Sequence, residues 1–63
     1  MKKEDLQEFE NKNIKIILNT GFTYNGEIIS LAEDHLKFYD RFLGRMLITY
    51  EDIRVIRLNE GSK

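Results

Sequence analysis

The chain has 63 residues, with ten Lys or Arg against eleven Asp or Glu, a formal charge of −1, and neither cysteine nor proline. A domain of this length buries only about 60% of the surface that its unfolded chain exposes, so disulfides, a metal or self-association normally supplement its core. The absence of cysteine excludes disulfides, and the single His35 gives no zinc-binding pattern. Self-association is therefore the expected supplement.

Membrane and secretory signals are missing from the sequence. No apolar run approaches the roughly 20 residues of a membrane helix, and the polar start, residues 1–5, has no apolar segment behind it. We therefore expect a cytoplasmic protein without a membrane partner. The near-zero charge does not point to a nucleic-acid binder, although a symmetric oligomer would repeat any basic patch. The second half of the chain holds Arg41, Arg45, Arg54 and Arg57.

The first predicted element is a short helix over residues 3–10. Leu6 and Phe9 lie three residues apart behind acids in the first turn, which is typical of a helix lying on a core. Such a short helix is unstable alone, and a frayed polar tail is the alternative. Residues 11–13 have turn chemistry.

Two strands follow, over residues 13–19 and 22–32. Ile14, Ile16 and Leu18 alternate with more polar residues, as in a half-buried strand. Gly21 suits the turn between the strands, since glycine adopts a positive φ at no steric cost. Apolar residues change face around Gly26, which predicts a bend or bulge that lets one long strand serve two sheets.

Strands are also predicted over residues 35–40, 45–50 and 53–58, and Phe38, like Tyr24, is expected in the core. The hairpin loop after residue 39 carries Phe42 and Leu43, which is unusual because loop tips are normally polar. Either one of these side chains folds back to cap the sheet, or the pair contacts a protein partner.

The last two strands carry apolar residues on both faces, and a domain this small has too few elements to cover both. A neighbouring subunit is the natural cover. The predicted oligomer interface comprises Met46, Leu47, Ile48, Val55, Ile56 and Leu58. The sequence thus predicts one mainly β domain over residues 1–63, with a short N-terminal helix and a strongly bent five-stranded antiparallel sheet that forms a small barrel.

These elements resemble an Sm-like protein of the LSm/Hfq superfamily. The matching features are the helix, the spacing of Ile16, Leu18, Gly21, Gly26 and Ile28, and the block over residues 46–56. The resemblance implies an SH3-like, Sm-like barrel and a cyclic homo-oligomer of about five to eight subunits, in which the fourth strand of one subunit pairs with the fifth of the next. It also implies binding of single-stranded RNA.

The chain departs from the family pattern at the RNA-binding motifs. Lys37 stands near the position of a family asparagine, and the arginine–glycine pair of the second motif is missing. The bacterial Hfq branch of the family has a tyrosine-lysine-histidine run between its last two strands. This chain retains the tyrosine as Tyr50, but Glu51 and Asp52 replace the two basic residues. Carboxylates repel phosphates, so this reversal argues against binding at the pore.

A site for single-stranded RNA needs aromatic platforms for bases and cations for phosphates. The candidate RNA-binding residues are His35, Lys37, Tyr39, Arg41, Arg45 and Tyr50. The alternative is that His35 is simply solvated and that Lys37 and Arg41 are ordinary surface charges.

Catalysis has little support in the sequence. There is no serine–histidine–acid set and no phosphate-binding glycine loop, and each of the acid pairs at 33–34 and 51–52 consists of adjacent residues that point apart. We expect neither an enzyme nor a cofactor or metal site. The first hypothesis is a ring-forming RNA-binding protein; the alternative is an oligomeric protein-interaction or scaffold module, favoured by Glu51, Asp52 and the Phe42–Leu43 loop.

Overall fold

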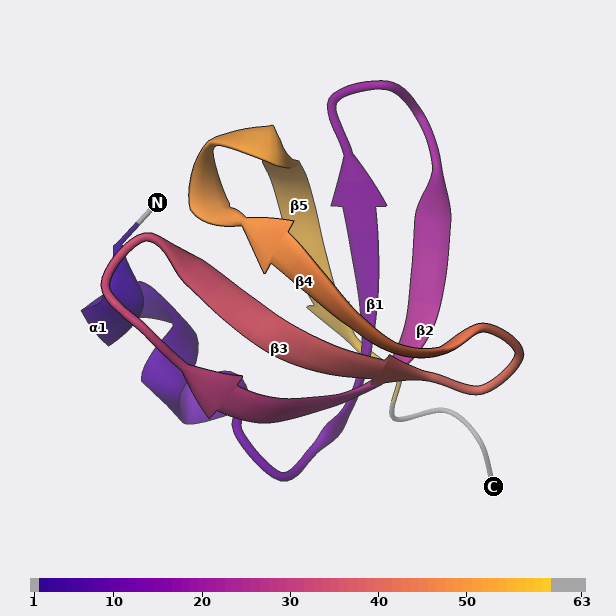
Figure 1. Ribbon diagram of the computed structural model, residues 1–63, viewed down its shortest axis with the longest axis horizontal. Helices are drawn as coiled ribbons and strands as arrows, with labels where there is room; N and C mark the ends of the chain where they lie inside the picture. Colours follow the sequence, from indigo (N-terminus) through magenta and orange to yellow (C-terminus); the bar gives the residue numbers. More distant parts are fainter. Residues whose placement is uncertain (1, 60–63) are drawn as a thin grey trace.

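The computed structural model describes residues 2–59, which form a short helical segment and one sheet of five antiparallel strands (Figure 1). The elements are α1 (Lys3–Leu6), the 3-10 helix η1 (Gln7–Phe9), β1 (Asn13–Leu18), β2 (Thr23–Leu31), β3 (His35–Asp40), β4 (Gly44–Thr49), the 3-10 helix η2 (Tyr50–Asp52) and β5 (Ile53–Leu58). The mainly β class, the five strands and the N-terminal helix are confirmed. The helix is shorter than expected, because only its first turn is α-helical.

The helical segment is fixed to the sheet rather than frayed. The Asp5 carboxylate accepts a hydrogen bond from the backbone N–H of Lys2 at 3.1 Å, which caps the first turn. Leu6 is fully buried, and Phe9 packs against the same core from η1. The segment ends at Asn11, whose φ of 62° lies in the left-handed region that asparagine tolerates.

Strand β2 joins the two halves of the sheet, whose strand order is β4-β3-β2-β1-β5. Its first half pairs with β1, from Thr23 opposite Ile17, and its second half pairs with β3 as far as Leu31 opposite Leu36. The two pairings overlap at Gly26, where an added Cβ would lie 1.8 Å from the carbonyl oxygen of Tyr39. Only glycine permits this approach of β3 to β2.

The irregularity in β2 lies three residues after Gly26. The register with β3 shifts between Ile28 and Ser30, so Ile29 is the extra, bulged residue. As a result Leu31 returns to the inner face that Ile28 occupies, whereas simple alternation had placed the two on opposite faces. Ile29 is left exposed on the outer side.

The sheet is not closed, so the predicted barrel is not confirmed within one chain. β4 and β5 are the two edge strands, and η2 directs the chain from β4 to a pairing with β1 instead of back along β4. The sheet nevertheless curls strongly, and β4, beside β3, crosses in front of β1 and β5 in Figure 1. Ile48 of β4 and Ile53 of β5 therefore share one core.

The core is formed by one apolar side of the curled sheet together with the helical segment. Phe38 is fully buried, as expected, and Tyr24 packs at its border. The buried residues are Leu6, Ile14, Ile16, Ile28, Leu36, Phe38, Ile48, Tyr50 and Ile53. The opposite side of β3 and β4 faces outward.

Candidate nucleic-acid interface

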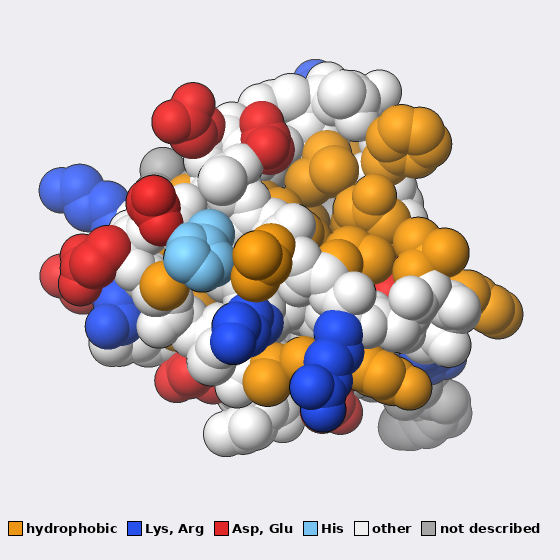
Figure 2. Space-filling model, viewed as in Figure 1, with side chains coloured by type: hydrophobic (Ala, Val, Ile, Leu, Met, Phe, Trp, Pro, Cys, Tyr) orange, Lys and Arg blue, Asp and Glu red, His pale blue; other side chains and the backbone are white. Residues whose placement is uncertain are grey.

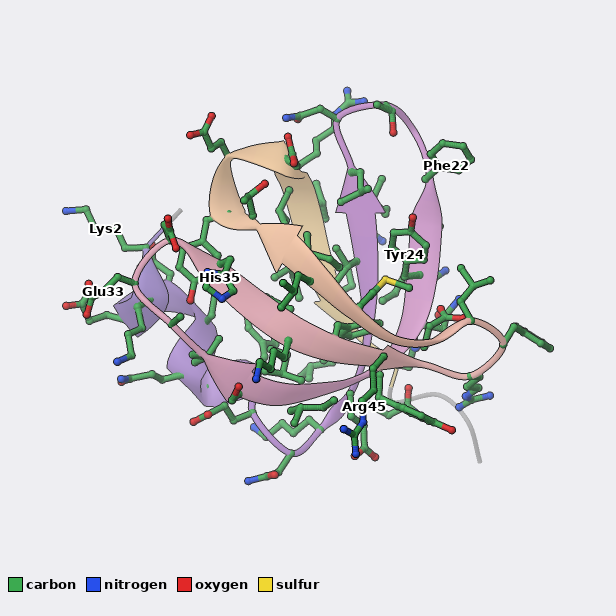
Figure 3. All side chains as sticks on the ribbon, viewed as in Figure 1. Lys2, Phe22, Tyr24, Glu33, His35 and Arg45 are labelled. Atoms are coloured by element: carbon green, nitrogen blue, oxygen red, sulfur yellow. The ribbon has the colours of Figure 1, made fainter. Side chains whose placement is uncertain are left out.

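Four of the six predicted RNA-binding residues lie on the outer face of β3 and β4. Lys37 pairs with Leu47, and Tyr39 pairs with Arg45, so each pair shares one face. His35, opposite Thr49, continues the same face. Figure 3 shows His35 and Arg45 toward opposite ends of β3, and Figure 2 shows the basic side chains in front of that strand.

A shallow groove runs along this face. Its volume is about 420 Å³, and it is lined by Ile29, Ser30, Lys37, Arg45, Met46 and Leu47. The bulge presents Ile29 to the groove, and Leu47, which is 65% exposed, lies on the β4 side. The groove therefore combines apolar walls with two cations.

Tyr39 supplies an aromatic ring beside the groove. It is 51% exposed, and its neighbours across the sheet are Arg45 on β4 and Glu27 on β2. The positive charge thus lies on the β4 side of the ring and the negative charge on the β2 side. A half-exposed ring with an arginine at one side can stack on a planar ligand whose anionic group points toward β4.

His35 is tied to its neighbour Asp34. The two side chains are joined at 2.8 Å through His35 Nδ1, which donates to the Asp34 carboxylate in the tautomer with a proton there. This hydrogen bond, helped by electrostatic attraction to His35, lowers the pKa of Asp34 against the desolvation of the carboxylate. His35, which is 34% exposed, is therefore oriented by Asp34 at the start of β3.

Arg41 and Tyr50 do not join the other four residues. Arg41 lies in the exposed β3–β4 loop, where its backbone N–H donates to the carbonyl of Asn25 at 3.1 Å. Tyr50 is only 5% exposed, and its hydroxyl donates to the carbonyl of Ala32. Burial, together with the charges of Glu33 and Asp34, raises the pKa of this hydroxyl. Tyr50 is therefore a core residue without a free face for stacking.

Asp40 builds the loop between β3 and β4. Its carboxylate is almost fully buried and accepts the backbone N–H groups of Phe42 at 2.8 Å, Leu43 at 2.9 Å and Asn25 at 3.2 Å. The hydrogen bonds from Leu43 and Phe42, and more weakly from Asn25, lower the pKa of Asp40 against desolvation. The loop is thus fixed from beneath by one side chain.

The loop tip points away from the core. Phe42 is 92% exposed and Leu43 is 67% exposed, so neither side chain folds back to cap the sheet. That alternative from the sequence is wrong, because the bonds to Asp40 turn the tip outward. In Figure 2 apolar side chains gather on the side of the molecule that holds this loop and the start of β2, where Phe22 is also exposed.

The six residues of the predicted interface separate into two groups. Ile48 lies in the core, and Met46 and Ile56 pack against it, so these three are used within one chain. Leu47 and Leu58 are exposed on the two edge strands, and Val55 is half-buried. Of the first group only Ile48 is closed to another subunit, because Met46 and Ile56 also line depressions on the surface.

Sequence reasoning missed Ile29 and Leu47 as parts of the groove. The available signal was the runs of consecutive apolar residues at 28–29 and 46–48. A strand with only one buried face normally alternates apolar and polar residues, so such runs indicate apolar side chains on the outer face as well.

Metal-binding clusters and membrane-spanning helices are not found among residues 2–59. That range contains no cluster of three or more His, Cys, Asp or Glu placed to hold a metal ion, and no helix in it has the length and apolarity to cross a membrane. A scan against protein-family models, a search of curated proteins and a search of solved structures each found no match to this chain.

Proposed function

We propose that this protein binds single-stranded RNA on the outer face of β3 and β4, acting as a self-associating, Sm-like protein. The observation that supports this most directly is that Tyr39 lies opposite Arg45, which lines the groove together with Lys37. A base stacks on the Tyr39 ring, and the adjoining phosphates are bound by the two cations. Stacking of one base on an aromatic side chain contributes about 1–3 kcal/mol.

The charges on this face determine along which strand the RNA backbone runs. Glu27 lies on the β2 side of Tyr39 and repels phosphate, whereas Arg45 lies on the β4 side and attracts it. The backbone of the RNA therefore follows β4, and the apolar walls of the groove, Ile29 and Leu47, receive the edge of a base or a ribose.

Self-association is supported by the two open edges of the sheet. β4 and β5 each present six residues without a strand partner on one side, and Leu47 and Leu58 are exposed on them. Pairing of β4 in one copy with β5 in the next covers both edges, and a cyclic arrangement leaves none open. Each copy then adds one RNA-binding face, and the repeated weak contacts add up to avidity.

A protein-interaction or scaffold module is the second candidate function. The observation that favours it is the loop tip, where Phe42 is the most exposed large apolar residue of the described chain and Leu43 is as exposed as Phe22. Glu51 and Asp52 are exposed on η2 and would repel RNA, which does not impair a module that binds a protein instead.

RNA binding is tested by fluorescence anisotropy with labelled U-rich and A-rich oligomers at several salt concentrations. We expect Tyr39→Ala to weaken binding at every salt concentration, and Lys37→Glu to weaken it and lower the salt slope by about 1 or more. Lys2→Glu, the same charge reversal on the N-terminal segment, is the matched control and should leave affinity nearly unchanged. No binding at micromolar protein and low salt would exclude the RNA function.

Self-association is tested separately by sedimentation. Leu47→Glu and Leu58→Glu place charges on the two exposed edges and should reduce the mass of the assembly, while circular dichroism shows that the chain stays folded. Ile48 is unsuitable for this test, since it lies in the core and its loss would unfold the protomer. A wild-type protein that stays monomeric at all concentrations would exclude the ring.

A further inference from the structure

We infer that the Phe42–Leu43 tip of one copy inserts into an apolar hollow beside β5 of a second copy. This inference rests on the self-association part of the proposed function and assigns a contact beyond the pairing of edge strands. It makes the β3–β4 loop the part of one subunit that recognises the next.

The tip is prepared for insertion before any contact forms. Asp40 accepts the N–H groups of Phe42 and Leu43, and the N–H of Arg41 donates to Asn25, so the loop backbone is held in one conformation. A contact made by such a loop loses little conformational entropy on binding. Its two apolar side chains, 92% and 67% exposed, remain in water until a partner covers them.

The hollow lies between the helical segment and β5. Two adjoining depressions, of about 450 Å³ and 420 Å³, share Phe9 and Ile56 as their apolar floor. Each has the size of pockets that receive small organic groups, roughly 300–1,000 Å³. Leu58, 42% exposed, extends the floor toward the end of β5.

Charge complementarity on the helix side of the hollow favours a second copy of this chain as the occupant. Asp5 and Glu8 line the helix side of the hollow, whereas Lys12, Arg54 and Arg57 line the rest of it, and Arg41 precedes the tip. The tip therefore enters with Arg41 toward the acids of the helical segment and away from the three cations. Because tip and hollow are different surfaces, the contact is heterologous and continues from copy to copy until a ring closes.

The proposed strand pairing and this contact are geometrically compatible. If β4 pairs antiparallel with β5 of the next copy, the first residue of β4, Gly44, comes near the last residue of β5, Leu58. The residues before Gly44 are the tip, and the surface beside Leu58 is the hollow. One docking geometry therefore satisfies both contacts.

Cysteine cross-linking tests the contact directly, since the chain has no native cysteine. Leu43→Cys and Lys12→Cys, at the tip and at the rim of the hollow, are mixed as separate proteins and oxidised. We expect a covalent dimer that contains one copy of each variant. Thr20→Cys, an exposed residue of the β1–β2 turn, is the matched control for Lys12→Cys and should not cross-link to Leu43→Cys.

Substitutions at the tip give a second measurement. Phe42→Ser should weaken self-association by at least about tenfold in sedimentation, which corresponds to about 1.4 kcal/mol. Phe22→Ser, the same change at another exposed phenylalanine, is the control and should have little effect. Arg41→Glu and Glu8→Arg should each weaken the assembly, and the double variant should restore it.

The outcomes separate this inference from the proposed function. An assembly that forms normally in Phe42→Ser, without the tip-to-hollow cross-link, overturns the inference and leaves the ring intact. Cross-links only between two Leu43→Cys chains show a tip-to-tip contact and overturn it as well. A monomeric wild-type protein removes self-association itself, and RNA binding is then judged by anisotropy alone.

Discussion

Gly26 lies so close to the backbone of Tyr39 that a Cβ atom at that position would be 1.8 Å from the Tyr39 carbonyl oxygen and 2.9 Å from its carbon. The obstacle is backbone, which cannot rotate away as a side chain can. Gly26 thus determines the path of β3 over β2, and with it the position of the Tyr39 ring that we place in the RNA site.

Gly26→Ala should destabilise the protein by at least about 3 kcal/mol, the upper end of the usual cost of overpacking. The measurement is urea denaturation followed by circular dichroism. Gly21→Ala is the control: its φ of 100° is strained for alanine, but nothing lies within 4 Å, so the cost should be about 1–2 kcal/mol. Equal costs at the two positions would contradict the close approach.

The loop held by Asp40 should be sensitive to acid. The folded-state pKa of Asp40 lies below the unfolded value of about 3.9, because Leu43 and Phe42 donate hydrogen bonds to the carboxylate. Its contribution to stability is therefore present above that value and is lost as pH falls through the folded pKa. We expect the amide resonances of Phe42 and Leu43 to shift together over this acid range. In Asp40→Asn these shifts should disappear, and the fall in stability at acid pH should become shallower.

Tyr50→Phe should remove one hydrogen bond and leave the packing intact. The lost bond to the Ala32 carbonyl should cost about 0.5–1.5 kcal/mol at neutral pH. Because burial raises the folded-state pKa of Tyr50, stability is complete below the unfolded value of about 10 and falls as pH rises toward the folded value. Urea denaturation on either side of pH 10 should show this fall in the wild type and less of it in Tyr50→Phe.

The two sides of β4 should respond differently to truncation. Ile48→Ala leaves a cavity in the core and should cost about 2–5 kcal/mol in the free energy of unfolding. Leu47→Ala, on the outer side, should change it by no more than about 0.5 kcal/mol when measured on dissociated protein. Large costs at both positions would mean that the outer face is also buried within one chain.

Much of the fold could be predicted because the strands carry their own signals. Alternation from Ile14 to Leu18 and the turn at Gly21, whose φ is positive, follow from local chemistry alone. The bulge at Ile29 could not be located, because Ile28 and Ile29 are both apolar and a one-residue shift exchanges the faces. Closure of the sheet could not be decided either, since it depends on whether β5 pairs with β4 or with β1.

The candidate site was predicted where residues lie two apart on one strand. Lys37 and Tyr39 share a face of β3 for that reason alone. Arg45 joins them only through the register with β4, which the Asp40 loop determines. Tyr50 was misassigned to the surface because its position follows a strand that ends one residue earlier than expected, and η2 turns the ring into the core.

Asn25 connects features that the chain places far apart. Its backbone N–H donates to Asp40 and its carbonyl accepts from Arg41, at the base of the loop, while its side-chain oxygen accepts from Asn59 at the end of β5 at 3.0 Å. If the tip of one copy docks beside the β5 end of the next, each copy makes one contact with its tip and another at the end of its β5. Asn25 is hydrogen-bonded to both of these regions. In such an assembly, docking at the tip would also restrain the end of β5 through Asn25.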